Sequence, residues 1–177
     1  MKETVKKLFL LQLRHAGIPD EIFHFLPDNE KRMLVEREGL FFLKPEERKK
    51  IRVVLTGGVF DIIHIGHVVT LSEAKKHGDV LVVAVARDSH IHRKNRQPVH
   101  PLEYRRIMVE ELKPVDIAIA GFTDPKKMLE FVGPDVIIYG YDQRETYKPE
   151  GVEIVKLAKS IDDSKFKTGK ILSELGL

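Results

Sequence analysis

Five short apolar runs alternate with segments of helical character, and this alternation constrains the fold of the chain more than any other feature. The runs are rich in valine and isoleucine and lie at residues 51–57, 79–86, 115–121, 135–140 and 152–158. Continuous runs of this kind are typical of strands buried on both faces of a parallel sheet. Helical patterns fill the intervening segments at residues 67–78, 101–112 and 124–133. We therefore predict an α/β fold: a Rossmann-like, doubly wound parallel sheet of five strands with helices on both faces.

Residues 1–49 have a different period and are predicted to form a small helical region ahead of the α/β domain, residues 50–177. Apolar residues recur at helical spacing from the start of the chain. Residues 18–20 interrupt this pattern before a second short helix. A third helix is expected over 28–38, with Gly39 as its stop signal.

Three roles are open for this N-terminal region: packing or dimerisation, cover for a substrate, and contact with DNA, in that order of preference. Residues 1–50 contain 11 basic and 9 acidic side chains. Such a balance argues against a strong phosphate-binding face. We therefore expect a homodimer and no nucleic-acid partner.

Composition excludes several kinds of chemistry. The chain has no cysteine, which rules out disulfides, thiolate catalysis and cysteine-ligated zinc. Its 42% hydrophobic and 32% charged residues fit a compact domain. No convincing signal peptide and no apolar span of membrane length is found, so we expect a cytoplasmic protein with no membrane partner.

The stretch TGGVFDIIHIGH, residues 56–67, directly follows the first predicted strand. In an open α/β sheet, ligands bind outside the carboxyl ends of the strands. Gly57 and Gly58 place backbone without side chains at that edge, where it can approach a phosphate closely. The N-terminus of the following helix would add N–H donors and a positive potential.

Two histidines of this stretch, His64 and His67, are three residues apart and would project from one face of a helical turn. Imidazole N–H groups can donate hydrogen bonds to phosphate oxygens. Asp61 is a candidate ligand for a Mg²⁺ ion that bridges phosphates. Two other interpretations stay open at this point: an incomplete metal site, or simply a polar start to a helix.

GGVFDIIHIGH resembles the [GT]xFDxxHxGH signature of the cytidylyltransferase-like nucleotidyltransferases, a superfamily that includes glycerol-phosphate cytidylyltransferases and archaeal FAD synthases. The resemblance spans roughly residues 51–171 and does not reach the N-terminal region. It implies that His64 and His67 contact the triphosphate of a nucleotide. It also implies a nucleotide-binding loop, made by Thr56, Gly57, Gly58, Val59, Phe60 and Gly66.

The segment of residues 86–121 is similar to the middle of archaeal FAD synthases. There, Lys94 matches a loop lysine that family members place on phosphates, and Arg105 matches an arginine near the start of the next helix. By resemblance, both join the histidines as catalytic residues. A solvated loop and a capped, solvent-facing helix are the structural alternatives.

Two further segments carry the resemblance less firmly. Gly140 and Asp142 occupy the place where relatives line the nucleotide pocket, although a turn explains Gly140 equally well. The run of residues 140–143 resembles the GxDQ of archaeal FAD synthases. Near the C-terminus, many relatives hold phosphates with a row of hydroxyls. Here Thr168 keeps one hydroxyl between two replaced positions, and it could equally cap a helix.

The implied reaction is transfer of a nucleoside monophosphate from ATP or CTP to a phosphorylated small-molecule acceptor, with release of pyrophosphate and with Mg²⁺ as the cofactor. The middle segment favours adenylylation of FMN. CTP-dependent transfer to a phosphorylated small alcohol is the alternative, because archaeal FAD synthases carry a cysteine-containing tail that this chain lacks. A nucleotide-binding regulator without turnover is the alternative of another class.

Overall fold

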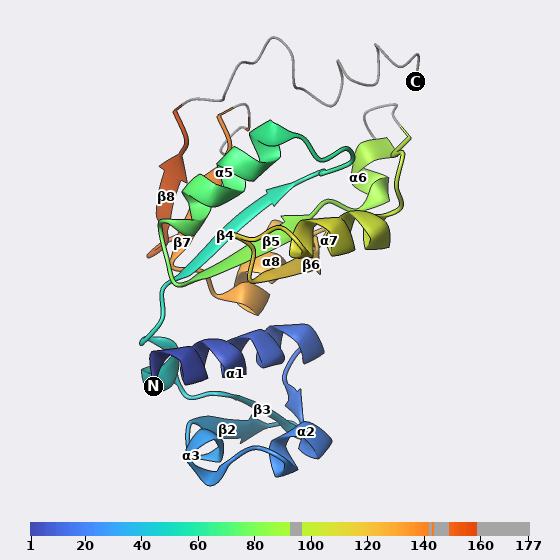
Figure 1. Ribbon diagram of the computed structural model, residues 1–177. Coiled ribbons are helices and arrows are strands. Elements are labelled where there is room, and N and C mark those ends of the chain that lie inside the picture. Colours follow the sequence, from blue (N-terminus) through green and yellow to red (C-terminus); the bar gives the residue numbers. More distant parts are fainter. Residues whose placement is uncertain (93–96, 142, 144–148, 159–177) are drawn as a thin grey trace. The chain divides into compact units, whose positions relative to one another are not determined.

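The computed structural model describes residues 1–92, 97–141, 143 and 149–158 (Figure 1). The chain divides into two compact units, Met1–Arg52 and Val53–Leu177, and each is described by itself. Among the described residues, no helix has the length and apolar character needed to cross a membrane.

The first unit combines helices with a small antiparallel sheet. Its elements are α1 (Lys2–His15), β1 (Ile18–Pro19), α2 (Asp20–His24), α3 (Asp28–Lys31), β2 (Leu34–Arg37), β3 (Leu40–Leu43) and α4 (Pro45–Arg48). The strand order is β1-β3-β2. The buried face of α1 packs in the core of this unit, with side chains at helical spacing: Val5, Leu8, Phe9 and Leu13.

The expected third helix over residues 28–38 is wrong for most of its length. Only α3 is helical, and β2 and β3 pair as a hairpin instead. Glu38 and Gly39, between the strands, both have positive φ, at 52° and 79°. A two-residue turn of this kind matches the twist of a hairpin. Gly39 therefore closes a turn and does not stop a helix.

The second unit contains the predicted parallel sheet. Its elements are β4 (Val53–Gly58), α5 (Ile65–Lys75), β5 (Val80–Val85), α6 (Asp88–His92), α7 (Leu102–Glu110), β6 (Ile117–Ala120), α8 (Pro125–Val132), β7 (Val136–Tyr139) and β8 (Glu153–Lys156). The five strands pair in parallel in the order β6-β5-β4-β7-β8. The predicted α/β fold is confirmed.

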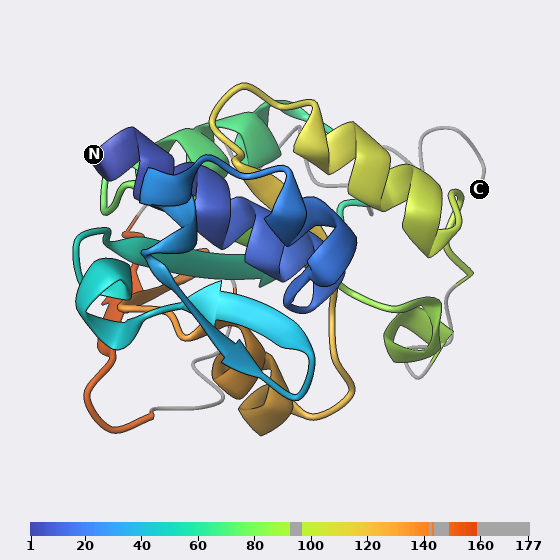
Figure 2. The ribbon, with the colours of Figure 1, turned by 90° about the horizontal axis from the view of Figure 1, so that it is seen from below.

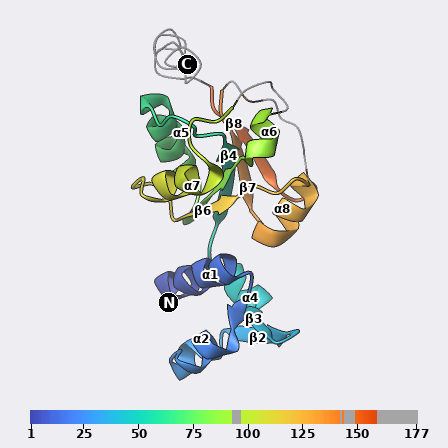
Figure 3. The ribbon, with the colours of Figure 1, turned by 90° about the vertical axis from the view of Figure 1, so that its right-hand side faces the viewer.

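Helices cover both faces of this sheet. Figures 2 and 3 show α5 and α7 on one face and α8 on the other. The chain moves from β4 outward to β5 and β6, and then returns to the other side of β4 to form β7. The strand order therefore reverses between β4 and β7. In doubly wound sheets, ligands bind at the carboxyl edge of this switch point.

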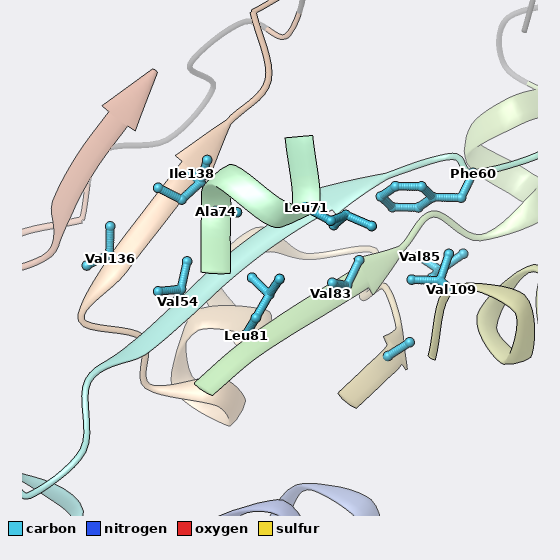
Figure 4. Packing of buried hydrophobic residues seen from close by; sticks show 11 residues of the cluster. Val54, Phe60, Leu71, Ala74, Leu81, Val83, Val85, Val109, Val136 and Ile138 are labelled. Atoms are coloured by element: carbon cyan, nitrogen blue, oxygen red, sulfur yellow. The ribbon is translucent and has the colours of Figure 1, made fainter. Parts of the chain in front are cut away.

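The core of the second unit lies between the sheet and α5 with α7. Val54, Leu81, Val83 and Val136 are completely buried in one cluster with Leu71 of α5 (Figure 4). Burial on both faces explains why these strands read as unbroken apolar runs. The core fixes the strands rigidly, so the loops at their carboxyl ends start from defined positions.

Two aspartates stabilise the opposite, amino-terminal edge of the sheet. Asp135 accepts a hydrogen bond from the backbone N of Val53 at 2.7 Å. Asp116 accepts one from the backbone N of Leu81 at 2.6 Å and pairs with Lys75. Because these carboxylates are already bonded at the edge opposite the switch point, they have a structural role.

Candidate active site

Strand β4 ends in two glycines at the carboxyl edge of the sheet, directly before the loop that leads to α5. A Cβ atom on Gly57 would lie 3.1 Å from the carbonyl oxygen of Ala84 on β5. A Cβ atom on Gly58 would lie 2.8 Å from the ring of Phe60. The contact at Gly58 is closer than real Cβ atoms come and the one at Gly57 is tighter than most, so the glycines let the end of β4 pack tightly. Both glycines are half-buried at this edge of the sheet.

Phe60 turns this loop back towards the core. It adopts a positive φ of 52°, and its side chain is buried. The ring packs against that of His67, with centroids 5.0 Å apart. The buried ring of Phe60 thus supports the ring of His67. A contact between Phe60 and the nucleotide stays a prediction.

His64 and His67 together begin helix α5. His64 is the N-cap residue, with extended backbone at φ −140° and ψ 170°. The backbone N of His67 donates to the backbone oxygen of His64 at 2.9 Å, and the backbone N of His64 donates to Nδ1 of His67 at 3.4 Å. The two rings stack with centroids 3.8 Å apart. The predicted pairing of the two histidines on one helical turn is present in the structure.

This capping arrangement determines which nitrogen of His67 can donate. Nδ1 accepts the backbone N–H of His64, so the proton of the neutral ring lies on Nε2. Burial, and secondly the neighbouring His64, lower the pKa of His67 to about 4. At neutral pH, His67 is therefore an uncharged ring with an N–H donor directed away from its own helix backbone.

The lowered pKa of His67 predicts a pH dependence of stability. Between pH about 6.5 and 4, the unfolded chain binds a proton at this residue that the folded chain does not. The free energy of unfolding should therefore decrease as the pH falls through this window, with His67 contributing on the order of 2 kcal/mol after allowance for partial exposure. Urea unfolding across this range should give a shallower pH profile for His67→Asn than for the wild type. Parallel profiles would contradict the lowered pKa.

Asp61 has different partners from those expected of a metal ligand. Its side chain is only 3% exposed. Its Oδ1 accepts hydrogen bonds from the backbone N of Val99 at 2.8 Å and of His100 at 3.1 Å. Nδ1 of His100 lies 3.0 Å from the backbone oxygen of Asp61. Asp61 therefore ties the β4–α5 loop to the segment that leads into α7.

Arg105 also has different partners from those expected of a phosphate ligand. Its side chain is completely buried, although a phosphate ligand must be accessible. The guanidinium donates to the backbone oxygens of Val59, Ala86 and His100 and to Oδ1 of Asp88, the last at 2.5 Å. The structure thus favours a positioning role for Arg105 over direct contact with a phosphate.

The remaining predicted nucleotide-binding residues lie at the same sheet edge. The hydroxyl of Thr56 is buried and donates to the backbone oxygen of Ile138 at 2.9 Å, which joins β4 to β7. Val59 is 37% exposed. A Cβ on Gly66 would lie 3.1 Å from the ring of His64, so this glycine makes room for the imidazole. Gly140 immediately follows β7, across the switch point.

Three predicted site residues, Lys94, Asp142 and Thr168, lie outside the described residues. Their roles stay predictions. The sequence did not single out Gln143, whose side chain bonds to both sides of the switch point. It also missed Asp88, the partner of Arg105. Asp88 carries no sequence signal of its own, whereas Gln143 lies within the GxDQ-like run.

Comparisons with known proteins agree with this geometry. A family model described as cytidylyltransferase-like matches residues 55–169. The chain is 45% identical over 135 residues to an FAD synthase of Aciduliprofundum boonei, covering 71% of this chain and 90% of that protein. It is 37% identical over 145 residues to an FAD synthase of Thermococcus onnurineus, covering 75% and 96%.

A solved structure has the same fold. The lipopolysaccharide core biosynthesis protein of Thermoplasma volcanium superposes with a TM-score of 0.58 at 38% sequence identity, covering 63% of this chain and 99% of that one. The matched family region starts at residue 55 and so leaves out the unit Met1–Arg52. With the histidine pair at the carboxyl edge of a parallel sheet, these matches show that the chain belongs to the cytidylyltransferase-like family and is a nucleotidyltransferase.

Proposed function

We propose that the chain transfers AMP from ATP to FMN, which forms FAD and releases pyrophosphate. The observation that carries this proposal is the similarity to FAD synthases at 37–45% identity over at least 90% of their lengths. The second unit, which carries the two glycines and the histidine pair, would perform this reaction.

In the proposed reaction, a phosphate oxygen of FMN attacks the α-phosphorus of ATP. A new P–O bond forms there, and the bond from the α-phosphorus to the bridging oxygen breaks, so that pyrophosphate leaves with the electron pair. The attacking oxygen is already anionic and needs no general base. Catalysis then consists mainly of positioning and of stabilising charge on the phosphates.

The histidine pair supplies that stabilisation in this proposal. Nε2–H of His67 donates to the triphosphate, and the ring of His64 stacks beside it on the same turn. A phosphate anion next to His67 would favour the protonated ring and so raise its pKa on binding. Lys94 is proposed as a further phosphate contact, and the backbone of Gly57 and Gly58 as the cradle.

A divalent cation, Mg²⁺, is proposed to accompany the nucleotide. Nucleotidyltransferases of this kind generally use a divalent metal, and Mg²⁺ commonly binds to substrate phosphates with few protein ligands. Among the described residues, no group of three or more histidines and carboxylates could hold an ion. The bonded and buried Asp61 does not fit the role of ligand, so we assign no step to a protein-held metal.

One similar solved structure carries a name unrelated to flavin. The solved relative is named a lipopolysaccharide core biosynthesis protein and aligns over 99% of its length. CTP-dependent transfer to a phosphorylated small alcohol is the alternative reaction, and a regulator without turnover is the alternative outside enzymes. A homodimer, a cytoplasmic location and the role of the unit Met1–Arg52 stay predictions.

The test is a matrix of nucleotides and acceptors. The full chain is incubated with Mg²⁺ and each pairing of ATP or CTP with FMN or glycerol 3-phosphate. Pyrophosphate, the nucleotidyl product and, by calorimetry, nucleotide binding are measured. We expect pyrophosphate and FAD from ATP with FMN. Release with CTP and glycerol 3-phosphate alone would overturn the flavin assignment, and nucleotide binding without release from any pair would support the regulator.

A further inference from the structure

The side-chain amide of Gln143 joins the two strands that border the switch point. Its Nε2 donates a hydrogen bond to the backbone oxygen of Gly57, at the end of β4, at 2.6 Å. Its Oε1 accepts one from the backbone N of Gly140, after β7, at 2.9 Å. The backbone N of Gln143 also donates to the oxygen of Gly140 at 3.0 Å. One side chain thus acts as donor to one strand end and acceptor from the other.

This bridge lies where the pairing between β4 and β7 stops. Thr56 of β4 and Ile138 of β7 form the last registered pair between these two strands, and Gly57 and Gly58 pair in register with β5. Beyond this pair, β4 and β7 have no further registered residue pairs in the described part of the chain. The amide of Gln143 supplies the next link, with the same combination of donor and acceptor that a strand residue would offer.

We propose that Gln143 is a positioning residue that fixes the separation of the ends of β4 and β7 and so holds the Gly57–Gly58 backbone in place to receive the triphosphate. This inference rests on the proposed nucleotidyl transfer at that edge. It does not depend on which acceptor is used, because the bridge contacts the nucleotide loop.

The chemistry of the bridge requires an amide. Glutamate has the same shape but no donor, so its carboxylate oxygen would face the carbonyl oxygen of Gly57, and its negative charge would lie near the triphosphate site. Leucine fills similar space but offers neither donor nor acceptor. Both changes should let the loop shift, and a displacement of about 1 Å can cost on the order of 10²-fold in rate.

The experiment compares Gln143→Glu and Gln143→Leu with the wild type in the full chain. Dissociation constants for ATP and for CTP are measured by calorimetry, kcat and KM with ATP and FMN, and melting temperatures in parallel. We expect nucleotide affinity and kcat/KM to fall about tenfold to a hundredfold, with the melting temperature almost unchanged. Gln97→Glu is the matched control, since it makes the same charge change at an exposed position of the same unit.

The outcomes separate this inference from the proposed function. If the wild type binds a nucleotide but makes no FAD, the acceptor assignment fails, and the affinities still decide the role of Gln143. Wild-type affinity and turnover in both variants would overturn the inference. It would equally be overturned if affinity fell only in step with a large drop in melting temperature, or if Gln97→Glu lost as much affinity as Gln143→Glu.

Discussion

Replacing His67 by asparagine is expected to lower the rate of nucleotidyl transfer by about 10²–10³-fold while the fold is retained. The Oδ1 atom of asparagine can take the place of Nδ1 and accept the backbone N–H of His64 at the start of α5. The variant loses the Nε2–H donor, which in the proposed reaction binds the triphosphate as its charge grows. Pyrophosphate release under single-turnover conditions measures the effect on the chemical step.

His67→Gln is the matched control for this prediction. Its amide N–H can reach the position of Nε2–H, whereas the bond to the backbone of His64 is lost, so part of the rate should return although the helix start is weakened. Circular dichroism should show both variants folded. Undiminished pyrophosphate release by His67→Asn would refute the role of the histidine donor.

The second large effect is expected at Arg105, where lysine should cost at least about 3 kcal/mol in the free energy of unfolding. The buried guanidinium reaches three backbone oxygens and Asp88 at once. The single ammonium of lysine cannot satisfy four acceptors in these positions. The unbonded carbonyl groups would release Val59 and the β4–α5 loop, so kcat/KM should also fall more than tenfold, as expected for misplaced catalytic groups.

Its neighbour in the chain is a well-matched control. Arg106 is half-buried on α7, pairs with Glu103 and Glu110, and makes a single backbone contact, to the oxygen of Ala118 at 3.3 Å. Arg106→Lys should cost less than about 1 kcal/mol. Urea unfolding of both variants and steady-state kinetics below their melting temperatures test the contrast. Equal, small losses of stability would show that the buried network does not support the loop.

The strands of the second unit could be predicted from the sequence, because parallel strands that are buried on both faces consist of continuous apolar runs. The sequence was less informative for the first unit. There, β2 and β3 are short strands whose pattern resembles a helix, and the meaning of Gly39 depends on the positive φ of Glu38 beside it. Only the pairing of β2 with β3 shows that Gly39 belongs to a turn and does not end a helix.

Site chemistry was predictable where it depends on local spacing and not where it depends on tertiary partners. Three-residue spacing placed His64 and His67 on one turn, as the structure shows. Arg105 was expected to be catalytic by resemblance, and Asp61 was expected to be a Mg²⁺ ligand as a carboxylate in the motif, but both bond to backbone groups from distant segments. No periodicity reveals such partners, since backbone carbonyl and amide groups carry no signature in the sequence.

His64 and His67 have two roles, one at the start of α5 and one in the proposed phosphate site, and this affects how the protein folds. Because the side chains that begin α5 are also the proposed phosphate donors, nucleation of that helix and assembly of the donor pair are a single local event. A chain in which the first turn of α5 frays loses its donors at the same moment. The integrity of the catalytic centre is therefore coupled to the thermodynamics of one helical turn, and a bound triphosphate would in return hold that turn closed.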